Sequence, residues 1–256
     1  MHSGKLRVYR ALCFLCLKTN LMLISGIEQC TLVDYPEKTA CIIFTPGCNF
    51  RCGYCHNPEF VLPEKIIQLK NSFIPETAVF NFLNERRGFL DGVVISGGEP
   101  TIMPDLIPFM DTIKSLGYLV KLDTNGNRPE VLEQAVTSGV VDYVAMDVKT
   151  SLAEYPTLVG PAVNPEAIKK SVEFLKAGHL DYEFRCTLIK EIHSPPILED
   201  MARLMGRAKQ IFLQSFRSAI TLKPSFKNFH AFSEQEMKVL ARTFLQHAEK
   251  VTLRLA

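Results

Sequence analysis

The chain has 256 residues, of which 47% are hydrophobic and 22% charged, and its formal net charge is +2. A chain of this length and composition can bury a core, which excludes an intrinsically disordered protein and allows one large α/β domain or two small ones. Its charges are interspersed without a basic stripe, so the sequence speaks against a nucleic-acid-binding protein.

The N-terminal residues 1–21 are expected to be an extension, followed by a single domain over residues 22–256. A charged start precedes a short apolar run at residues 11–17. That run is too short to cross a membrane, and no cleavage site of small residues follows it. We therefore expect no membrane attachment, and Met22 is the expected natural start.

From residue 40 onward, short apolar runs alternate with segments of helical periodicity. Helices are predicted at residues 75–87, 104–116, 129–138, 165–177, 196–206 and 233–249. Strands are predicted at residues 40–44, 92–96, 118–123, 140–147, 182–189, 210–214 and 251–255. The strands are nearly continuous apolar runs, as expected of parallel strands buried on both faces.

This alternation predicts an α/β fold with a parallel sheet and helices outside it. The number of βα units falls short of eight, so we expect a partial, open parallel β/α barrel of about six units. A flat doubly wound sheet is the alternative. In α/β barrels the functional groups lie at the carboxyl ends of the strands.

Three cysteines, Cys48, Cys52 and Cys55, follow the first predicted strand with the spacing C-x3-C-x2-C. A disulfide framework would leave one of them over, whereas three thiolates can hold a soft metal cluster. A cluster with three cysteine ligands keeps one iron open for a small ligand. The alternatives are buried small side chains or a zinc knuckle. The cysteine spacings do not resemble those of a secreted mini-domain, so a reducing cytosol is expected.

Polar residues and glycines recur at the ends of the following strands. Glycines without Cβ atoms allow a backbone edge to approach a ligand closely. Such a set could hold a ligand that carries both an ammonium and a carboxylate. The candidate residues are Gly97, Gly98, Glu99, Pro100, Asp123, Thr124, Asp147, Lys149 and Arg185.

Several of these residues also have a structural interpretation. Asp123 and Asp147 could cap helices, and Arg185 could pair with a neighbouring carboxylate. His56 could belong to a turn or position the cysteine loop. The remaining cysteines of the domain, Cys30, Cys41 and Cys186, are expected to be core thiols. Surface or loop positions are expected for His193, His230 and His247.

The cysteine motif, with Tyr54 before its last cysteine, and the Gly97–Pro100 segment together resemble the radical S-adenosylmethionine enzymes. The resemblance covers residues 22 to the C-terminus. Further motifs are similar to the activating proteins of anaerobic ribonucleoside-triphosphate reductase and to the pyruvate formate-lyase activating enzyme. These motifs span residues 32–36, 45–52, 54–58, 123–126 and 146–149.

The resemblance implies a role for each candidate residue. Cys48, Cys52 and Cys55 would bind a [4Fe-4S] cluster, whose open iron takes the amino and carboxylate groups of S-adenosylmethionine. Tyr54 would lie near the adenine. The Gly97–Pro100 segment would receive the methionine ammonium. The methionine carboxylate would lie near Asp123, Thr124 and Asp147, with a monovalent cation between. Lys149 and Arg185 would neutralise charge on the cofactor.

The resemblance also implies a cytoplasmic activase with one cluster. An electron donor such as flavodoxin would deliver one electron, S-adenosylmethionine would be cleaved, and a hydrogen would be taken from a glycine of a larger partner enzyme. Anaerobic ribonucleotide reductase is the expected partner. The alternatives are another glycyl radical enzyme and a small-molecule reaction like that of 7-carboxy-7-deazaguanine synthase. A non-catalytic zinc scaffold is a third hypothesis.

Overall fold

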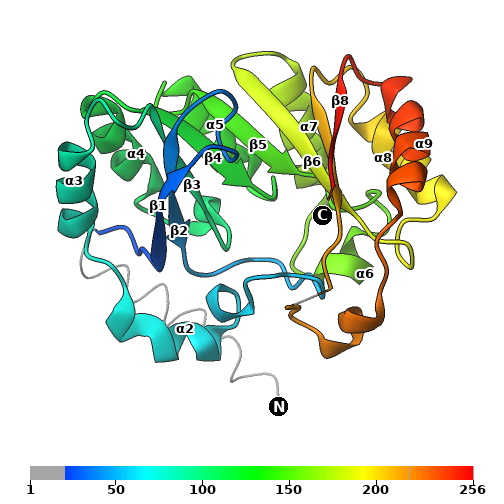
Figure 1. The fold of residues 1–256 in the computed structure, drawn as a ribbon, viewed down its shortest axis with the longest axis horizontal. Coiled ribbons are helices and arrows are strands. Elements are labelled where there is room, and N and C mark those ends of the chain that lie inside the picture. Colours follow the sequence, from blue (N-terminus) through cyan, green and yellow to red (C-terminus); the bar gives the residue numbers. More distant parts are fainter. Residues whose placement is uncertain (1–20, 219, 256) are drawn as a thin grey trace. The chain divides into compact units, whose positions relative to one another are not determined.

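The computed structural model describes residues 21–218 and 220–255, so the predicted extension lies outside the described residues except for Leu21. Seven predicted strands are present and an eighth, β1, precedes them (Figure 1). The strands are β1 (Gly26–Thr31), β2 (Ala40–Thr45), β3 (Gly92–Gly97), β4 (Leu119–Thr124), β5 (Tyr143–Asp147), β6 (Asp181–Leu188), β7 (Ile211–Ser215) and β8 (Val251–Arg254).

The six predicted helices are also present, with small differences at their ends. They are α3 (Glu76–Glu85), α4 (Leu106–Ser115), α5 (Pro129–Thr137), α7 (Pro165–Lys176), α8 (Pro195–Leu204) and α9 (Glu234–Leu245). The sequence analysis did not predict α2 (Pro63–Leu69) or α6 (Tyr155–Val159), because each is too short to show a helical period. Helix α9 begins with the capping box of Ser233 and Glu236 that its sequence suggests, and it ends four residues earlier than predicted.

The described chain divides into two compact units. The first consists of residues 21–48, 59–122 and 138–141, and the second of residues 49–58, 123–137 and 142–255 without residue 219. Strand β4 crosses the boundary, since its last two residues, Asp123 and Thr124, belong to the second unit.

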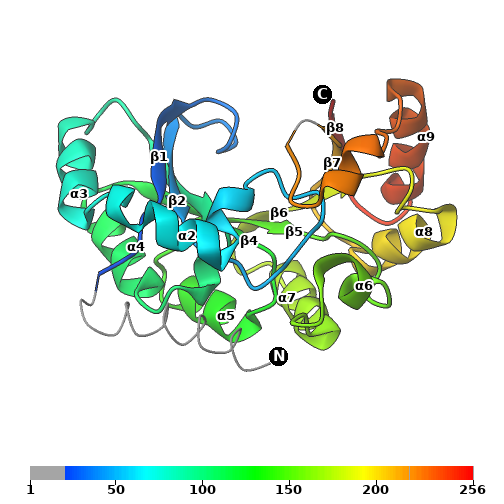
Figure 2. The same ribbon diagram turned by 90° about the horizontal axis from the view of Figure 1, so that it is seen from below.

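In the first unit, strands follow one another in the sheet in chain order, from β1 to β4. Strand β1 is antiparallel to β2, whereas β2 and β3, and then β3 and β4, pair in parallel. The register of β2 and β3 sets Thr45 opposite Gly97, so both strands end at the same level. Helices α3 and α4 lie side by side, and the Phe80 and Phe109 rings are 5.4 Å apart (Figure 2).

In the second unit, strands β5, β6, β7 and β8 also follow chain order, and all of their pairings are parallel. Helices α8 and α9 contact each other, and α9 packs on β7 and β8 (Figure 1). The carboxyl ends of these parallel strands therefore share one edge, where Asp147 ends β5 directly opposite Arg185 of β6.

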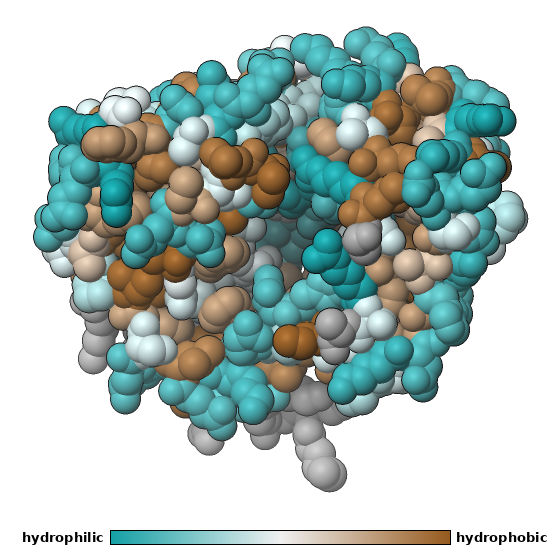
Figure 3. Space-filling model, viewed as in Figure 1, coloured by the Kyte–Doolittle hydropathy of each residue, from teal (hydrophilic) through white to brown (hydrophobic). Residues whose placement is uncertain are grey.

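The predicted fold class is confirmed, because the sheet is open and its strands pair in parallel from β2 to β4 and from β5 to β8. Each strand from β2 to β7 is followed by a helix, which gives the six expected βα units. The central strands are buried, with Val93, Val94 and Ile95 of β3 fully excluded from solvent. On the face shown in Figure 3, hydrophilic and hydrophobic residues are intermixed, as the interspersed charges of the sequence suggest.

Candidate functional site

A turn brings two of the three motif cysteines together. The Cys55 N–H donates to the Cys52 carbonyl oxygen at 3.1 Å, so Gly53 and Tyr54 are the central residues of a four-residue turn. The Cys52 and Tyr54 side chains are buried, whereas Cys55 is half-buried. The C-x2-C spacing is thus one tight turn with two thiols at its ends.

The protein environment of Cys52 disfavours its charged form. Burial raises the pKa of the Cys52 thiol to about 11, although the positive charge of Lys149 acts in the opposite direction. A metal-ligating cysteine is a thiolate, so binding at Cys52 would release a proton.

The third motif cysteine, Cys48, lies in a different compact unit from the other two. Cys48 is half-buried and belongs to the first unit, whereas Cys52 and Cys55 belong to the second. Among residues 21–218 and 220–255, no group of three or more Cys, His, Asp or Glu side chains is gathered so that it could hold a metal ion. The three-cysteine metal site therefore stays a prediction from the sequence.

Four charged side chains at the edge of the second unit form a continuous chain of ion pairs. The Arg185 Nη1 donates to Asp123 Oδ2 at 3.0 Å, and its Nε donates to Asp147 Oδ1 at 2.8 Å. The Lys149 Nζ then donates to the other oxygen of Asp147, Oδ2, at 3.1 Å. All four residues are ligand-binding candidates predicted from the sequence, and the structure brings them together.

The charge pattern of this chain follows from the sheet register. Asp147 of β5 lies opposite Arg185 of β6, so the pairing of the strands itself makes the contact. Although burial opposes ionisation, Arg185 and Lys149 hold the pKa of Asp147 well below its usual range. Burial likewise opposes the charge of Lys149, but Asp147 raises the pKa of Lys149 well above its usual value. Asp147 and Lys149 are therefore charged at neutral pH, as is Arg185, whose pKa the carboxylates of Asp123 and Asp147 raise against the effect of burial.

Arg185 pairs with neighbouring carboxylates, as its structural interpretation predicts. Its guanidinium lies between Asp123 and Asp147, and its side chain is only 13% exposed. A positive charge from the protein thus already separates the two carboxylates. The binding roles of these residues, and the monovalent cation, stay predictions.

Two side chains that the sequence analysis did not select hold the main chain of Lys149. The Lys149 N–H donates to the Tyr155 hydroxyl at 3.0 Å, and the His193 Nε2–H donates to the Lys149 carbonyl at 2.9 Å. The Ile189 N–H donates to His193 Nδ1 at 2.9 Å, which fixes the neutral tautomer with its proton on Nε2. His193 lies at an expected loop position, between β6 and α8, but its side chain is buried among these backbone groups and is not at the surface.

His193 gives the first testable prediction, a dependence of stability on pH. Burial lowers the pKa of His193 in the folded protein, so the unfolded chain binds its proton more readily. The free energy of unfolding should then fall as pH is lowered from about 7.5 to about 5.5, through the ordinary histidine pKa. Urea unfolding measured at a series of pH values checks this.

The control variant for this prediction is His193→Gln. A glutamine amide can donate to the Lys149 carbonyl and accept from the Ile189 N–H, but it does not titrate. We expect a smaller change of unfolding free energy with pH in this variant than in the wild type. Equal pH dependence in the two proteins would contradict the assignment of the effect to His193.

The packing and conformation of the protein's own backbone already require glycine at positions 97 and 98, whether or not a ligand binds. A Cβ atom at Gly98 would lie 1.8 Å from the Gly47 carbonyl oxygen, and Gly97 adopts a φ of +115°. The Gly98 N–H donates to the Thr45 carbonyl and the Glu99 N–H to the Gly47 carbonyl, both at 2.8 Å. The segment therefore binds the loop directly before Cys48, in the first unit.

The Glu99 carboxylate is buried and holds the following turn. Its Oε1 accepts hydrogen bonds from the Thr101 N–H at 3.2 Å and from the Thr101 hydroxyl at 2.5 Å. Glu99 thus caps the short 3₁₀ helix Pro100–Ile102. Its predicted contact with a ligand ammonium stays a prediction.

The turn after β4 is tied to the cysteine loop by two asparagines. The Asn125 Nδ2 donates to Asn49 Oδ1 at 2.8 Å, and Asn49 lies between the first and second motif cysteines. Thr124 is buried, and its hydroxyl oxygen accepts from the Gly126 N–H at 3.1 Å. Asn125 belongs to the motif at residues 123–126, but its place in the sequence does not indicate a role. Only the folded chain shows its contact with Asn49.

The cysteines outside the motif differ in burial. Cys41 and Cys186 are buried as predicted, and burial raises the pKa of the Cys41 thiol to about 12. The expected core position of Cys30 is wrong, because this residue of the β1 strand is exposed. Strand β1 is an edge strand with no neighbouring strand along one side, so fewer groups cover its side chains.

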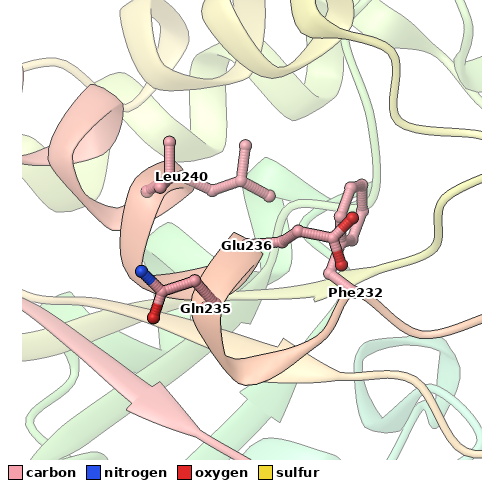
Figure 4. Close-up of a pocket in the computed structure, with 5 residues that line it drawn as sticks. Phe232, Gln235, Glu236 and Leu240 are labelled. Atoms are coloured by element: carbon pink, nitrogen blue, oxygen red, sulfur yellow. The ribbon is translucent and has the colours of Figure 1, made fainter.

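One pocket lies on helix α9, away from the predicted site residues. Its lining residues are Phe232, Gln235, Glu236, Val239 and Leu240 (Figure 4). None of the candidate cysteine or ligand-binding residues contributes to it.

None of the helices formed by the described residues combines the length and apolar character that a membrane crossing needs.

Comparison with known proteins gives one family match. Residues 42–205 match the family model described as "Radical SAM superfamily". This stretch contains all thirteen residues that the sequence analysis selected for the cluster and its ligand. It begins within β2 and ends after α8.

Two relatives and one solved structure agree with this match. A protein of Methanocaldococcus jannaschii named as a glycyl-radical enzyme activating enzyme is 32% identical over 91% of this chain and 95% of its own. The pyruvate formate-lyase-activating enzyme of Streptococcus mutans is 32% identical over half of each chain. The crystal structure of a domain of the pyruvate-formate lyase-activating enzyme from Bacteroides vulgatus has a TM-score of 0.52 at 18% identity. It covers 64% of this chain and 98% of that one, and it supports the fold alone.

Proposed function

The chain belongs to the radical SAM superfamily and is an enzyme of the glycyl-radical activating type, and we propose that its partner is anaerobic ribonucleoside-triphosphate reductase. The family implies S-adenosylmethionine and an iron–sulfur cluster as cofactors. We further propose that the cluster is of the [4Fe-4S] type with Cys48, Cys52 and Cys55 as ligands. The proposal includes a cytoplasmic location and flavodoxin, or a similar protein, as electron donor.

The residues of the second unit fit such a cofactor. The turn at Gly53 and Tyr54 presents two thiols at the C-x2-C spacing, and thiolates are the usual ligands of iron–sulfur clusters. Lys149 acts on Cys52 and offsets part of the cost of forming a buried thiolate. The single observation that carries the proposal is that one compact unit holds both the cysteine turn and the ion-pair chain of Asp123, Arg185, Asp147 and Lys149.

When bound, the cluster and S-adenosylmethionine supply the radical chemistry, and the protein supplies binding and orientation. The alternating carboxylates and cations of the second unit offer partners for both the ammonium and the carboxylate of an amino acid. Lys149 is held at its side chain by Asp147 and at its main chain by Tyr155 and His193. Its ammonium therefore keeps one position, which avoids the cost of reorganising a mobile side chain.

The buried Tyr54 is proposed to contact the adenine of S-adenosylmethionine. Its ring is excluded from solvent, and burial raises the pKa of its hydroxyl well above the ordinary value. A neutral aromatic ring next to the cysteine turn can pack on the flat face of an adenine. This supports the role that the family resemblance implies for Tyr54.

The proposed function is tested by a search for a glycyl radical. The protein is incubated anaerobically with a reductant, S-adenosylmethionine and either anaerobic ribonucleotide reductase or pyruvate formate-lyase. We expect the doublet of a glycyl radical in the electron paramagnetic resonance spectrum of the reductase. Pyruvate formate-lyase is included because the S. mutans relative carries that name.

Each other outcome changes the proposal in a defined way. A doublet only with pyruvate formate-lyase would replace the partner and keep the activase. No doublet with either enzyme, together with turnover of a small substrate, would favour a small-molecule radical SAM enzyme such as a 7-carboxy-7-deazaguanine synthase. Zinc in place of iron and sulfide after anaerobic purification would favour the zinc scaffold.

A further inference from the structure

A segment from far along the chain covers the turn between Cys52 and Cys55. This covering segment, residues 220–230, contains the 3₁₀ helix Pro224–Asn228 and follows β7. The Lys223 N–H donates to the Gly53 carbonyl oxygen at 2.9 Å. The Phe226 ring is buried and lies over the turn, with its centroid 6.2 Å from that of Tyr54.

The Phe226 ring occupies the space that a side chain at position 53 would need. A Cβ atom built on Gly53 would lie 2.2 Å from Phe226 Cε2, 2.6 Å from Cζ and 2.8 Å from Cδ2. Real Cβ atoms essentially never come within 3.0 Å of such neighbours. The φ of Gly53 lies outside the left-handed region, so its backbone conformation does not itself require glycine. The ring is therefore what excludes a side chain at this position.

The ring has little freedom to move aside. Phe229 packs against it with a centroid distance of 4.4 Å, and Tyr54 lies on it from the turn itself. The Phe226 N–H donates to the Lys223 carbonyl at 3.0 Å, which keeps the ring and the anchor to Gly53 in one short helix. Closely packed aromatic groups transmit a displacement to their neighbours, since no space is left to absorb it.

A second contact holds the other end of the same turn. The His56 Nε2–H donates to the Arg217 carbonyl at 2.7 Å, and the His56 ring stacks on Phe216 at a centroid distance of 6.2 Å. The motif residues from Gly53 to His56 are thus held by residues that follow β7. The sequence separation is more than 150 residues, so this support forms only when the second unit is folded.

We propose that Phe226 is a positioning residue for the cysteine turn, and that Gly53 is glycine because the Phe226 ring must rest on its backbone. The contact fixes the distance and direction of the Cys52 and Cys55 thiols before any ligand binds. The link to cluster binding rests on the proposed function. The contact between ring and turn is a property of the chain alone and is tested separately.

The test measures how fast Cys52 reacts with a thiol reagent in the full-length protein kept anaerobic with a chelator. Peptide mass spectrometry resolves Cys52 from the other cysteines. Gly53→Ala should raise the Cys52 labelling rate by about 5- to 150-fold, the range that overpacking of a well-packed site produces. Phe226→Ala should also raise it, because the ring no longer holds the turn.

The double variant Gly53→Ala with Phe226→Ala separates this mechanism from two unrelated defects. The added methyl group then has free space, so the double variant should label no faster than Phe226→Ala alone. Multiplication of the two single effects would overturn the proposal. Iron bound after anaerobic reconstitution should fall in both single variants. In the double variant it should equal that of Phe226→Ala.

Two controls keep the result interpretable if a variant folds poorly. Cys186 lies in the same unit and is buried, so its labelling reports general unfolding. An equal rise at Cys186 and Cys52 would overturn a local role for Phe226. Gly26→Ala is the matched glycine control, since a Cβ there meets its nearest atom at 3.6 Å, and it should label like the wild type. Wild-type protein without bound iron would refute the proposed function, while the labelling comparison still tests this contact.

Discussion

Cys52→Ala is expected to abolish the reductive cleavage of S-adenosylmethionine by the anaerobically reconstituted protein. Three cysteine ligands are needed to hold a cluster that keeps one iron open, and alanine supplies no ligand. Cys52 is also the motif cysteine on which the charge of Lys149 acts. Methionine and 5′-deoxyadenosine are measured by chromatography after reduction, together with the iron and sulfide content.

The matched control is Cys30→Ala. Cys30 is exposed on β1 and belongs to none of the motifs, so its removal should leave iron content and cleavage at the wild-type level. Wild-type cleavage by Cys52→Ala would contradict the assignment of the cluster ligands. Loss of cleavage in both variants would show that the preparation, and not the ligand, is at fault.

Arg185→Met should destabilise the protein strongly. Its guanidinium lies between Asp123 and Asp147, and all three side chains are at least 70% shielded from solvent. Removing one partner of a buried ion pair leaves an uncompensated charge, which typically costs about 3–5 kcal/mol of unfolding free energy. Urea unfolding at neutral pH measures the loss.

The pH dependence of the unfolding free energy of Arg185→Met identifies the cause of its lower stability. Lys149 still pairs with Asp147 in this variant. Without the guanidinium, burial and repulsion from Asp147 raise the pKa of the Asp123 carboxyl above that of the unfolded chain. The variant should therefore regain stability relative to the wild type as pH falls from about 7 to about 5. A constant difference between the two proteins would point to lost packing and not to lost charge.

Arg203→Met serves as the matched control for this variant. Arg203 lies on α8, its side chain is 61% exposed, and it pairs with Glu199 and Asp200 on the same helix. Exposed ion pairs contribute about 0–1 kcal/mol because water and salt screen them. The control should therefore lie close to the wild type at every pH.

The sequence was sufficient to predict the fold class and most of its elements. Parallel strands are buried on both faces, so runs such as 40–44 and 92–96 are nearly continuously apolar and are recognised locally. Capping and turn residues act over a few positions, and Ser233 with Glu236 marks the start of α9 as predicted. Strand β1 was missed because it is an edge strand with an exposed stretch and no helix after it.

The sequence by itself also selected the residues of the candidate site, because its chemistry depends on residue types at fixed spacings. The cysteine motif and the four charged residues were all selected in this way, and their ligand-binding roles stay predictions. What only the tertiary structure decided is which distant groups hold them. The register of β5 and β6 sets Asp147 opposite Arg185. His193 and Phe226 gain their roles from buried contacts with Lys149 and Gly53. Such contacts join residues far apart in the chain, and spacing along a sequence carries no information about them until the sheet brings its strands together.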